Sequence, residues 1–258
     1  RAMTPTGAPA QAAPAPLAKD KPADQSSRTA STTYRSAPKT TTAEREEAVA
    51  LSGVERQHFL AACEHDHDLQ IASGKAPAFV CKILKVPAGS DTTAITTTAT
   101  YPNSQTFLLH SRPTATRKVY LDFTGHTTTG TPWNGYWNNA SFTTPPFSLD
   151  ANTGAFSDPE HAAIQTVWRR MAEDFAAFDV DVTTEDPGLE GLLRTSVGDL
   201  NYGMRVIFGP DQNATGSGGV AYVGSFSGLR VAGAPDVPCF VFAAVGAGTK
   251  FMTEAGSH

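Results

Sequence analysis

Apolar residues are spread unevenly along the chain and divide it into four regions. Residues 1–42 are dominated by Ala, Pro, Thr and Ser, with almost no large apolar side chains. Such a segment cannot bury enough surface to offset the conformational entropy that it would lose on folding. We therefore expect a disordered leader over residues 1–42.

The second region, residues 43–86, predicts a small unit of helix and strand. A helix begins near Thr42, with acidic residues in its first turn where the helix dipole favours them. Apolar residues at 54–61 continue the helical pattern after Gly53, and the apolar run at 79–86 predicts a strand. Residues 87–116 are again rich in Thr and Pro, and we interpret them as an exposed linker open to proteolysis.

The fourth region, residues 117–258, alternates strands and helices as an α/β domain does. Ser157 and Glu160 form a capping-box pattern, and apolar residues then recur at helical spacing from Ile164 to Phe178. We interpret this stripe as a face packed on a sheet. A further helix begins near Lys250. Five strands are predicted, at residues 118–123, 180–183, 204–208, 220–223 and 239–243. The second is predicted because Val alternates with polar residues, and the last is apolar throughout and should be central.

Composition and charge narrow the classes of function. The 258 residues carry a net charge of −5, which argues against nucleic acid as a partner. No run approaches the roughly 18 apolar residues that a membrane-spanning helix needs. With 22 Gly, 18 Pro, abundant Thr and few Lys, the composition is typical of an exported protein. We expect secretion.

Cysteines and histidines offer few sites for chemistry. Cys63 and Cys81 are close enough in sequence to form a local disulfide, which would leave Cys239 without a partner in this sequence. We favour this disulfide over the alternative that the thiolate of Cys63 or Cys81 caps a zinc ion. The histidines of Cys-Glu-His-Asp-His-Asp at 63–68 are two residues apart, so a helix would point them in different directions. We interpret this segment as a solvated helix end.

Polar residues near the strands have plain structural interpretations. Asp122 and His126 follow the first strand, where α/β folds often place functional groups, but we favour a loop cap for Asp122 and packing for His126. The Gly218–Gly219 segment lacks the spacing of a phosphate-binding loop, and no G-x-S-x-G nucleophile elbow occurs. Trp133 and Trp137 could stack on sugars, although packing in a loop or core is the commoner role.

Five segments together resemble a family of secreted bacterial zinc metalloproteases of the zincin type, similar to the reprolysin-like metzincins. They are KVYLDFTGH at 118–126, FSDPEHAAI at 156–164, VWRRMAEDF at 167–175, FDVDVTTEDP at 178–187 and GVAYVGSF at 219–226. The resemblance covers about residues 117–258. It implies a mixed, twisted five-stranded sheet with a backing helix and the start of an active-site helix.

The resemblance also implies the site. The segment EAGSH at 254–258 matches the lead into the family's H-E-x-x-H motif, which places His258 on the first zinc-binding histidine. Two histidines four residues apart on a helix reach one zinc ion, and the glutamate between them meets the zinc-bound water. The glutamate, the second histidine and the third ligand would follow His258. The strand Val220, Ala221, Tyr222 and Val223 would be the antiparallel edge strand that binds an extended peptide substrate.

The sequence thus predicts the precursor of a secreted zinc endopeptidase, which would be a monomer and would act on proteins or peptides. We expect this chain to be inactive by itself, because one histidine cannot hold catalytic zinc. The resemblance also allows calcium, for which no ligand loop stands out. The alternative is a non-catalytic exported module for adhesion or for binding carbohydrate or cell wall on the same scaffold. The residues that follow His258 discriminate between the two.

Overall fold

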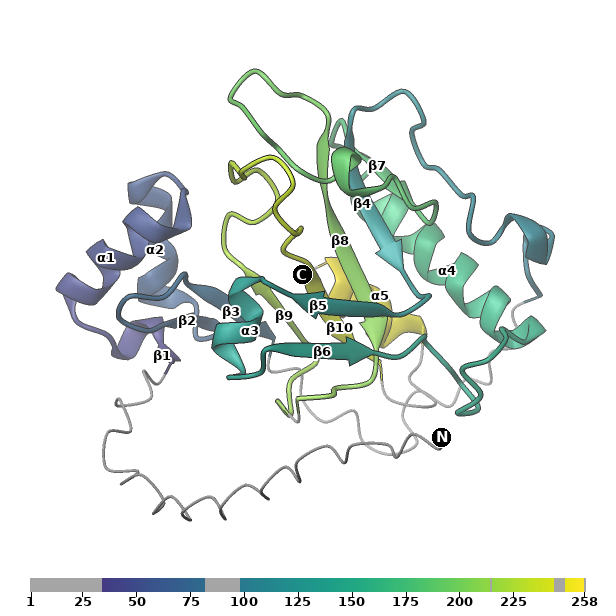
Figure 1. Cartoon of the computed structure of the whole chain (residues 1–258), viewed down its shortest axis with the longest axis horizontal. Coiled ribbons are helices and arrows are strands. Elements are labelled where there is room, and N and C mark those ends of the chain that lie inside the picture. Colours follow the sequence, from purple (N-terminus) through teal and green to yellow (C-terminus); the bar gives the residue numbers. More distant parts are fainter. Residues whose placement is uncertain (1–33, 82–97, 214, 244–248, 258) are drawn as a thin grey trace, which may run out of the picture. The chain divides into compact units, whose positions relative to one another are not determined.

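The computed structural model describes residues 34–81, 98–213, 215–243 and 249–257 (Figure 1). Most of the predicted leader and the segment 82–97 lie outside these ranges. Residues 34–42, which we assigned to the leader, are ordered. They contain strand β1 (Arg35–Ser36) and a 3-10 turn (Ala37–Lys39), and Ala37 is fully buried. The prediction of disorder up to residue 42 is therefore wrong over these nine residues.

The N-terminal unit consists of two helices and three short strands. Helix α1 (Thr42–Ser52) begins with a capping box between Thr41 and Glu44 and ends at Gly53, whose φ is 67°. The other elements are α2 (Arg56–His65), β2 (Leu69–Ile71) and β3 (Ala78–Cys81). They enclose a small core of their own, made of Ala37, Ala48, Phe59, Cys63, Leu69 and Ile71.

Five further strands join those of the N-terminal unit in one eight-stranded mixed sheet, in the order β1-β2-β3-β9-β10-β8-β4-β7. Pairs β10–β8, β8–β4 and β4–β7 are parallel, whereas β9 runs antiparallel to β10. The prediction of a mixed α/β fold is confirmed, and β10 is central as expected. The five predicted strands are β4 (Arg117–Asp122), β7 (Asp181–Thr183), β8 (Tyr202–Gly209), β9 (Gly219–Tyr222) and β10 (Cys239–Phe242).

Helices α4 (Asp158–Asp174) and α5 (Thr249–Ser257) share the main core with one face of the sheet. The capping box holds as predicted, since the Ser157 amide and hydroxyl both donate to the Glu160 carboxylate, at 2.7 and 2.9 Å. Alternate strand residues point to this core because side chains along a strand alternate between the faces. The core includes Leu121, Phe123, Ile164, Val167, Met171, Val206, Phe208, Val241 and Met252.

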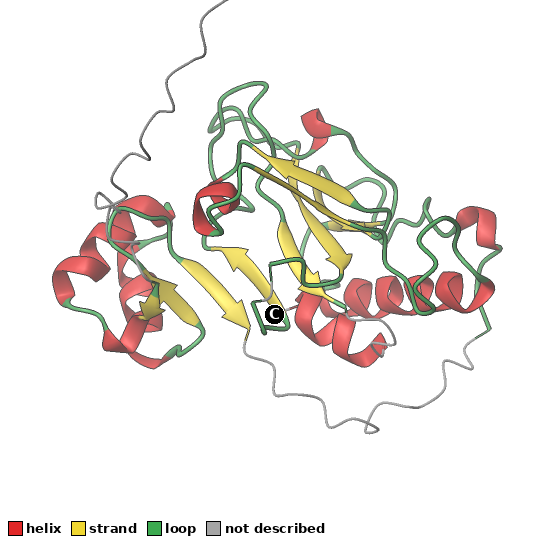
Figure 2. Cartoon of the chain, turned by 60° about the horizontal axis from the view of Figure 1, so that its bottom comes forward, coloured by secondary structure: helices red, strands yellow, loops and turns green. Residues whose placement is uncertain are grey.

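The opposite face of the sheet is covered by elements in a segment for which we predicted neither helix nor strand. A hairpin of β5 (His126–Thr129) and β6 (Ser141–Thr144) flanks the short helix α3 (Pro132–Tyr136), and Figure 2 shows the sheet and helices from a second side. Trp133 of α3 is fully buried, and its indole Nε1 donates to the Pro238 carbonyl at 2.7 Å. Trp133 is therefore a core residue and not a surface for stacking sugars.

The predicted linker is ordered from residue 98 onward. Leu109 is buried in the main core, and the Leu109 amide donates to the Thr184 hydroxyl at 3.0 Å. His110 forms an antiparallel bridge with Thr183, and the Ser111 amide donates to the Val182 carbonyl at 3.0 Å. Residues 98–116 thus extend the fold beside β7, and only the part of the predicted linker at 87–97 lies outside the described residues.

Candidate functional site

Strand β9 carries the residues predicted to bind a peptide substrate: Val220, Ala221, Tyr222 and, directly after it, Val223. The direction of β9 agrees with the expectation, because β9 is antiparallel to β10. The position of β9 differs from the predicted edge position. Strand β3 of the N-terminal unit pairs with the other side of β9, so β9 lies inside the eight-stranded sheet and not at its edge.

The side chains of β9 alternate between two environments. Val220 and Tyr222 are buried in an aromatic core, where the Tyr222 ring lies 4.1 Å from the ring of Trp133, measured between centroids. Burial raises the pKa of Tyr222 well above its ordinary value, and the neighbouring Tyr34 raises it further. Tyr222 is therefore a neutral packing residue. Ala221 faces the other way and lines a cavity on the side of the sheet that carries α4 and α5.

Helix α5 would deliver the predicted zinc ligand. Met252 is fully buried in the main core and holds the helix against the sheet. At the last turn, the Ser257 hydroxyl donates to Asp174 of α4 at 2.6 Å. Gly256 faces α4 so closely that a Cβ there would stand 3.0 Å from the Met171 sulfur. His258 itself lies outside the described residues, but its immediate neighbour is fixed in place.

A cavity of about 320 Å³ brings β9 and the end of α5 together. Ala221 contributes to its wall from β9, and Gly256 and Ser257 contribute from α5. The lining is otherwise mainly apolar, with residues such as Phe79, Phe175, Phe178, Met204, Phe226 and Val241. The structure thus unites two features that the sequence had linked only through a family resemblance.

Two cysteines, Cys81 and Cys239, lie in the cavity wall. Cys239 lies in the wall, and burial raises the pKa of its thiol to about 12. The thiol donates to the Arg205 carbonyl at 3.7 Å, a distance suited to sulfur. A thiolate is the reactive form of cysteine, so Cys239 is inert at neutral pH.

The disulfide that we favoured between Cys63 and Cys81 is not formed. Cys63 is fully buried in the core of the N-terminal unit, where burial raises the pKa of its thiol. Cys81 ends β3 and contributes to the cavity wall instead. The N-terminal unit is therefore held together by its apolar core and not by a covalent link.

The described residues contain no group of three or more His, Cys, Asp or Glu side chains that could hold a metal ion. The His65–Asp68 segment ends α2 as a solvated turn, in which the Asp66 carboxylate accepts hydrogen bonds from the Asp68 and Leu69 amides at 2.8 and 3.2 Å.

Asp122 caps its loop as interpreted, because its Oδ1 atom accepts from the Thr124 amide and hydroxyl at 3.0 and 2.9 Å. The sequence did not reveal its second partner. Arg205 of β8 is buried and donates to Asp122 Oδ2 at 2.6 Å and to Asp236 Oδ2 at 3.1 Å. Burial, followed by the charge of Arg205, lowers the pKa of the nearby His126, which is therefore neutral and packed. These residues act as a buried structural network.

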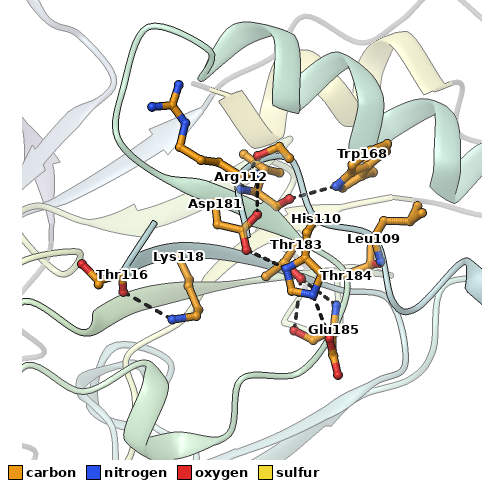
Figure 3. A network of polar contacts seen from close by, with 12 residues as sticks. Leu109, His110, Arg112, Thr116, Lys118, Trp168, Asp181, Thr183, Thr184 and Glu185 are labelled. Carbon is orange, nitrogen blue, oxygen red and sulfur yellow. Dashed lines mark hydrogen bonds and ion pairs between the residues drawn. The ribbon is translucent and has the colours of Figure 1, made fainter. Parts of the chain in front are cut away.

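A second polar network joins the 98–116 segment to β7 (Figure 3). The His110 ring lies between two carboxylates, with Nδ1 at 2.6 Å from Asp181 and Nε2 at 2.7 Å from Glu185. Asp181 is buried and also accepts from the Arg112 amide at 3.0 Å. The site therefore clamps the segment to the sheet, and no pattern in the sequence marks it.

Comparisons of the chain with protein-family models, curated proteins and solved structures found no match. Among the described residues, no helix is both long and apolar enough to cross a membrane. The geometry of β9, α5 and the cavity between them is thus the basis for a functional proposal.

Proposed function

We propose that the chain belongs to a secreted zinc-dependent endopeptidase, with β9 as the strand that binds the peptide and α5 as the start of the active-site helix. The observation that carries the proposal is the shared cavity. Ala221 of β9 and Ser257 of α5 line the same space, so a peptide held along β9 would lie near residue 258. The antiparallel direction of β9 beside the parallel strands agrees with this family.

The main chain of β9 would supply most of the binding. An extended peptide added to a strand bonds through backbone N–H and C=O groups, which makes binding tolerant of sequence. Gly218 and Gly219 precede or begin β9 and carry no side chain that would hinder such a peptide. Tyr222 and Val220 would keep the strand rigid, because their side chains are anchored in the aromatic core.

Helix α5 would fix the direction in which His258 points. Its last described turn is held by Met252 in the core and by the bond from Ser257 to Asp174. Zinc bound there would activate a water molecule and polarise the scissile carbonyl. One histidine does not hold catalytic zinc, so the proposal requires a glutamate next to His258 and a second histidine four positions after it.

The first test is the coding sequence that follows His258. The proposal fails if it does not encode Glu-x-x-His. If it does, a chain extended through the third ligand should bind one zinc ion. Once β3 has been displaced from β9, the same chain should hydrolyse a quenched fluorescent peptide library, and a chelator should abolish that hydrolysis. His258→Ala in the extended chain should lose zinc, measured by mass spectrometry of the metal, and should retain the wild-type circular dichroism spectrum.

Export from the cell belongs to the same proposal and is supported by the Thr-rich, Lys-poor composition. Its test is fractionation of cells that express the native gene, with immunodetection in the medium. Protein found only inside intact cells would contradict export without bearing on the peptidase chemistry.

A further inference from the structure

The pairing between β3 and β9 is more extensive than the pairing between β9 and β10. All four residues of β9 have register partners in β3: Tyr222 with Ala78, Ala221 with Phe79, Val220 with Val80 and Gly219 with Cys81. Only Val220 and Gly219 have partners in β10. Two further backbone bonds extend the pairing at its ends, from Gly218 N to Cys81 O at 2.8 Å and from Val223 N to Pro77 O at 3.0 Å.

Strand β3 also continues both faces of β9. Ala78 is fully buried and belongs to the same aromatic core as its partner Tyr222. Phe79 lines the cavity together with its partner Ala221. A peptide added to β9 would meet these same two environments, because side chains alternate along any strand. Strand β3 therefore stands where an added peptide strand would stand.

Contacts outside the strand pair secure the N-terminal unit in this position. The Tyr34 ring lies 4.5 Å from the ring of Tyr136 in α3, measured between centroids. Val223, directly after β9, packs against the core of the N-terminal unit. Gly224 has a φ of +75°, and a Cβ at this position would overlap the carbonyl oxygen of Ser52 at the end of α1. The fit against α1 therefore depends on Gly224 having no side chain.

We infer that residues 34–81 are a built-in inhibitor, in which β3 occupies the peptide-binding side of β9. The inference rests on the proposed function for the identity of β9 as a peptide-binding strand. Main-chain pairing does not discriminate strongly between sequences, so β3 and a substrate compete for the same N–H and C=O groups. Because β3 belongs to the same chain, its effective concentration is roughly millimolar. A free peptide of similar intrinsic affinity therefore displaces β3 only at a comparable concentration.

Gly224→Ala provides a test that leaves both strands unaltered. The added Cβ should push the end of α1 away from β9 and loosen β3. Gly74→Ala is the matched control, because Gly74 has a similar φ of +69° but no atom within 4 Å of an added Cβ. Both variants carry the same backbone strain, and only one disturbs the contact between the N-terminal unit and β9.

Two measurements on the full chain report the outcome. Amide hydrogen exchange should accelerate by at least about tenfold at Gly218 and Val223 in Gly224→Ala, since both amides donate to the N-terminal unit. The Phe242 amide donates to Gly218 O at 2.9 Å within the rest of the sheet and should remain protected. A fluorescein-labelled peptide that copies residues 76–81 with Cys81→Ser should bind Gly224→Ala, by fluorescence anisotropy, and should not bind the wild type or Gly74→Ala.

Peptide binding to the wild type and to Gly224→Ala with equal affinity would overturn the inference, because β3 would then not exclude a competitor. Release of the Gly218 and Val223 amides without peptide binding would overturn it too, and would count against β9 as a peptide site. If Gly224→Ala does not fold, Ala78→Asp is the second variant, since it places a charge on β3 inside the aromatic core. Neither measurement needs zinc, so failure of the zinc chemistry in the extended chain remains a separate result.

Discussion

Gly256 of α5 lies against Met171 of α4, where a Cβ would stand 3.0 Å from the Met171 sulfur and 3.2 Å from the Phe208 ring. The absence of a side chain at Gly256 thus sets how closely the end of α5 approaches α4. This spacing fixes the position of the last described turn of α5, which ends at Ser257. Any larger residue at this position should therefore affect both stability and the proposed metal site.

Gly256→Val should lower the free energy of unfolding by about 1–3 kcal/mol, because overpacking a filled core forces side chains off their preferred rotamers. Urea denaturation followed by circular dichroism measures this change. Gly198→Val is the control, since a Cβ at Gly198 meets no atom within 4 Å. Equal losses in the two variants would show that the α4–α5 contact is not the cause.

Asp174 connects α4 to the last described turn of α5 through its bond with Ser257. In a chain extended past His258, Asp174→Ala should weaken zinc binding by roughly tenfold, as loss of a residue that orients a ligand-bearing segment does. Competition with a fluorescent zinc chelator measures the affinity. Glu173→Ala removes the same charge from an exposed neighbour and should leave the affinity unchanged. This prediction depends on the proposed function, and equal affinities would contradict it.

The elements that were predicted correctly carry strong local signals. Four of the five predicted strands of the domain follow mainly apolar runs, and β7 follows an alternation of Val with polar residues. Strand β10 is apolar in all four of its positions, as a strand buried on both faces should be. Helix α4 has a capping box at Ser157 and an apolar stripe from Ile164 to Met171 that faces the sheet. Phe178, which we placed on the same stripe, lies past the end of the helix and is 59% exposed, so that part of the prediction is wrong. In these cases local preference and tertiary burial agree, so the sequence alone is sufficient.

The elements that were missed depend on contacts between distant residues. The hairpin of β5 and β6 is rich in Thr and resembles a loop, but it is stabilised by pairing across 12 to 18 residues of sequence and by covering the aromatic core. Residues 98–116 become ordered because His110 and Leu109 find partners more than 70 positions away. A local pattern does not contain this information.

In the candidate site, too, the individual strands were predictable from local sequence and their pairing was not. The apolar run 220–223 was sufficient to identify β9, and the run at 79–86 was sufficient to identify β3 (Ala78–Cys81), although residues 82–86 of that run lie outside the described residues. Their pairing could not be predicted, because main-chain hydrogen bonds leave almost no record in side-chain sequence. The cavity between β9 and α5 likewise appears only when both are placed on the sheet.

Asp122 and Arg205 test how far a buried ion pair supports the fold. Asp122→Asn retains an oxygen for the Thr124 amide but removes the charge that faces Arg205, so it should cost about 2–4 kcal/mol of the free energy of unfolding. The double variant Asp122→Asn/Arg205→Met should lose less than the sum of the two single variants. Urea denaturation of all four proteins gives the coupling energy, and strict additivity would contradict a direct interaction.

His110 should make stability depend on pH. Partial burial lowers its pKa, but hydrogen bonds to Asp181 and Glu185 and the charges of both carboxylates outweigh burial, so the pKa of His110 is raised above 6.5. A histidine with a raised pKa in the folded state stabilises the fold while it is protonated. The contribution is fully present below the ordinary value and is lost as the pH rises through the raised value.

His110→Gln should therefore be less stable than the wild type at about pH 5.5, and the difference should shrink towards about pH 9. Urea denaturation at several pH values measures this difference, and titrations elsewhere in the protein cancel between the two chains. Glu185→Gln leaves Asp181 in place as the remaining carboxylate at the ring and should show a smaller pH-dependent loss. If the difference in the free energy of unfolding between the wild type and His110→Gln instead grows with pH, the neutral ring is the form that stabilises the fold. That result would contradict a clamp built on two charged hydrogen bonds.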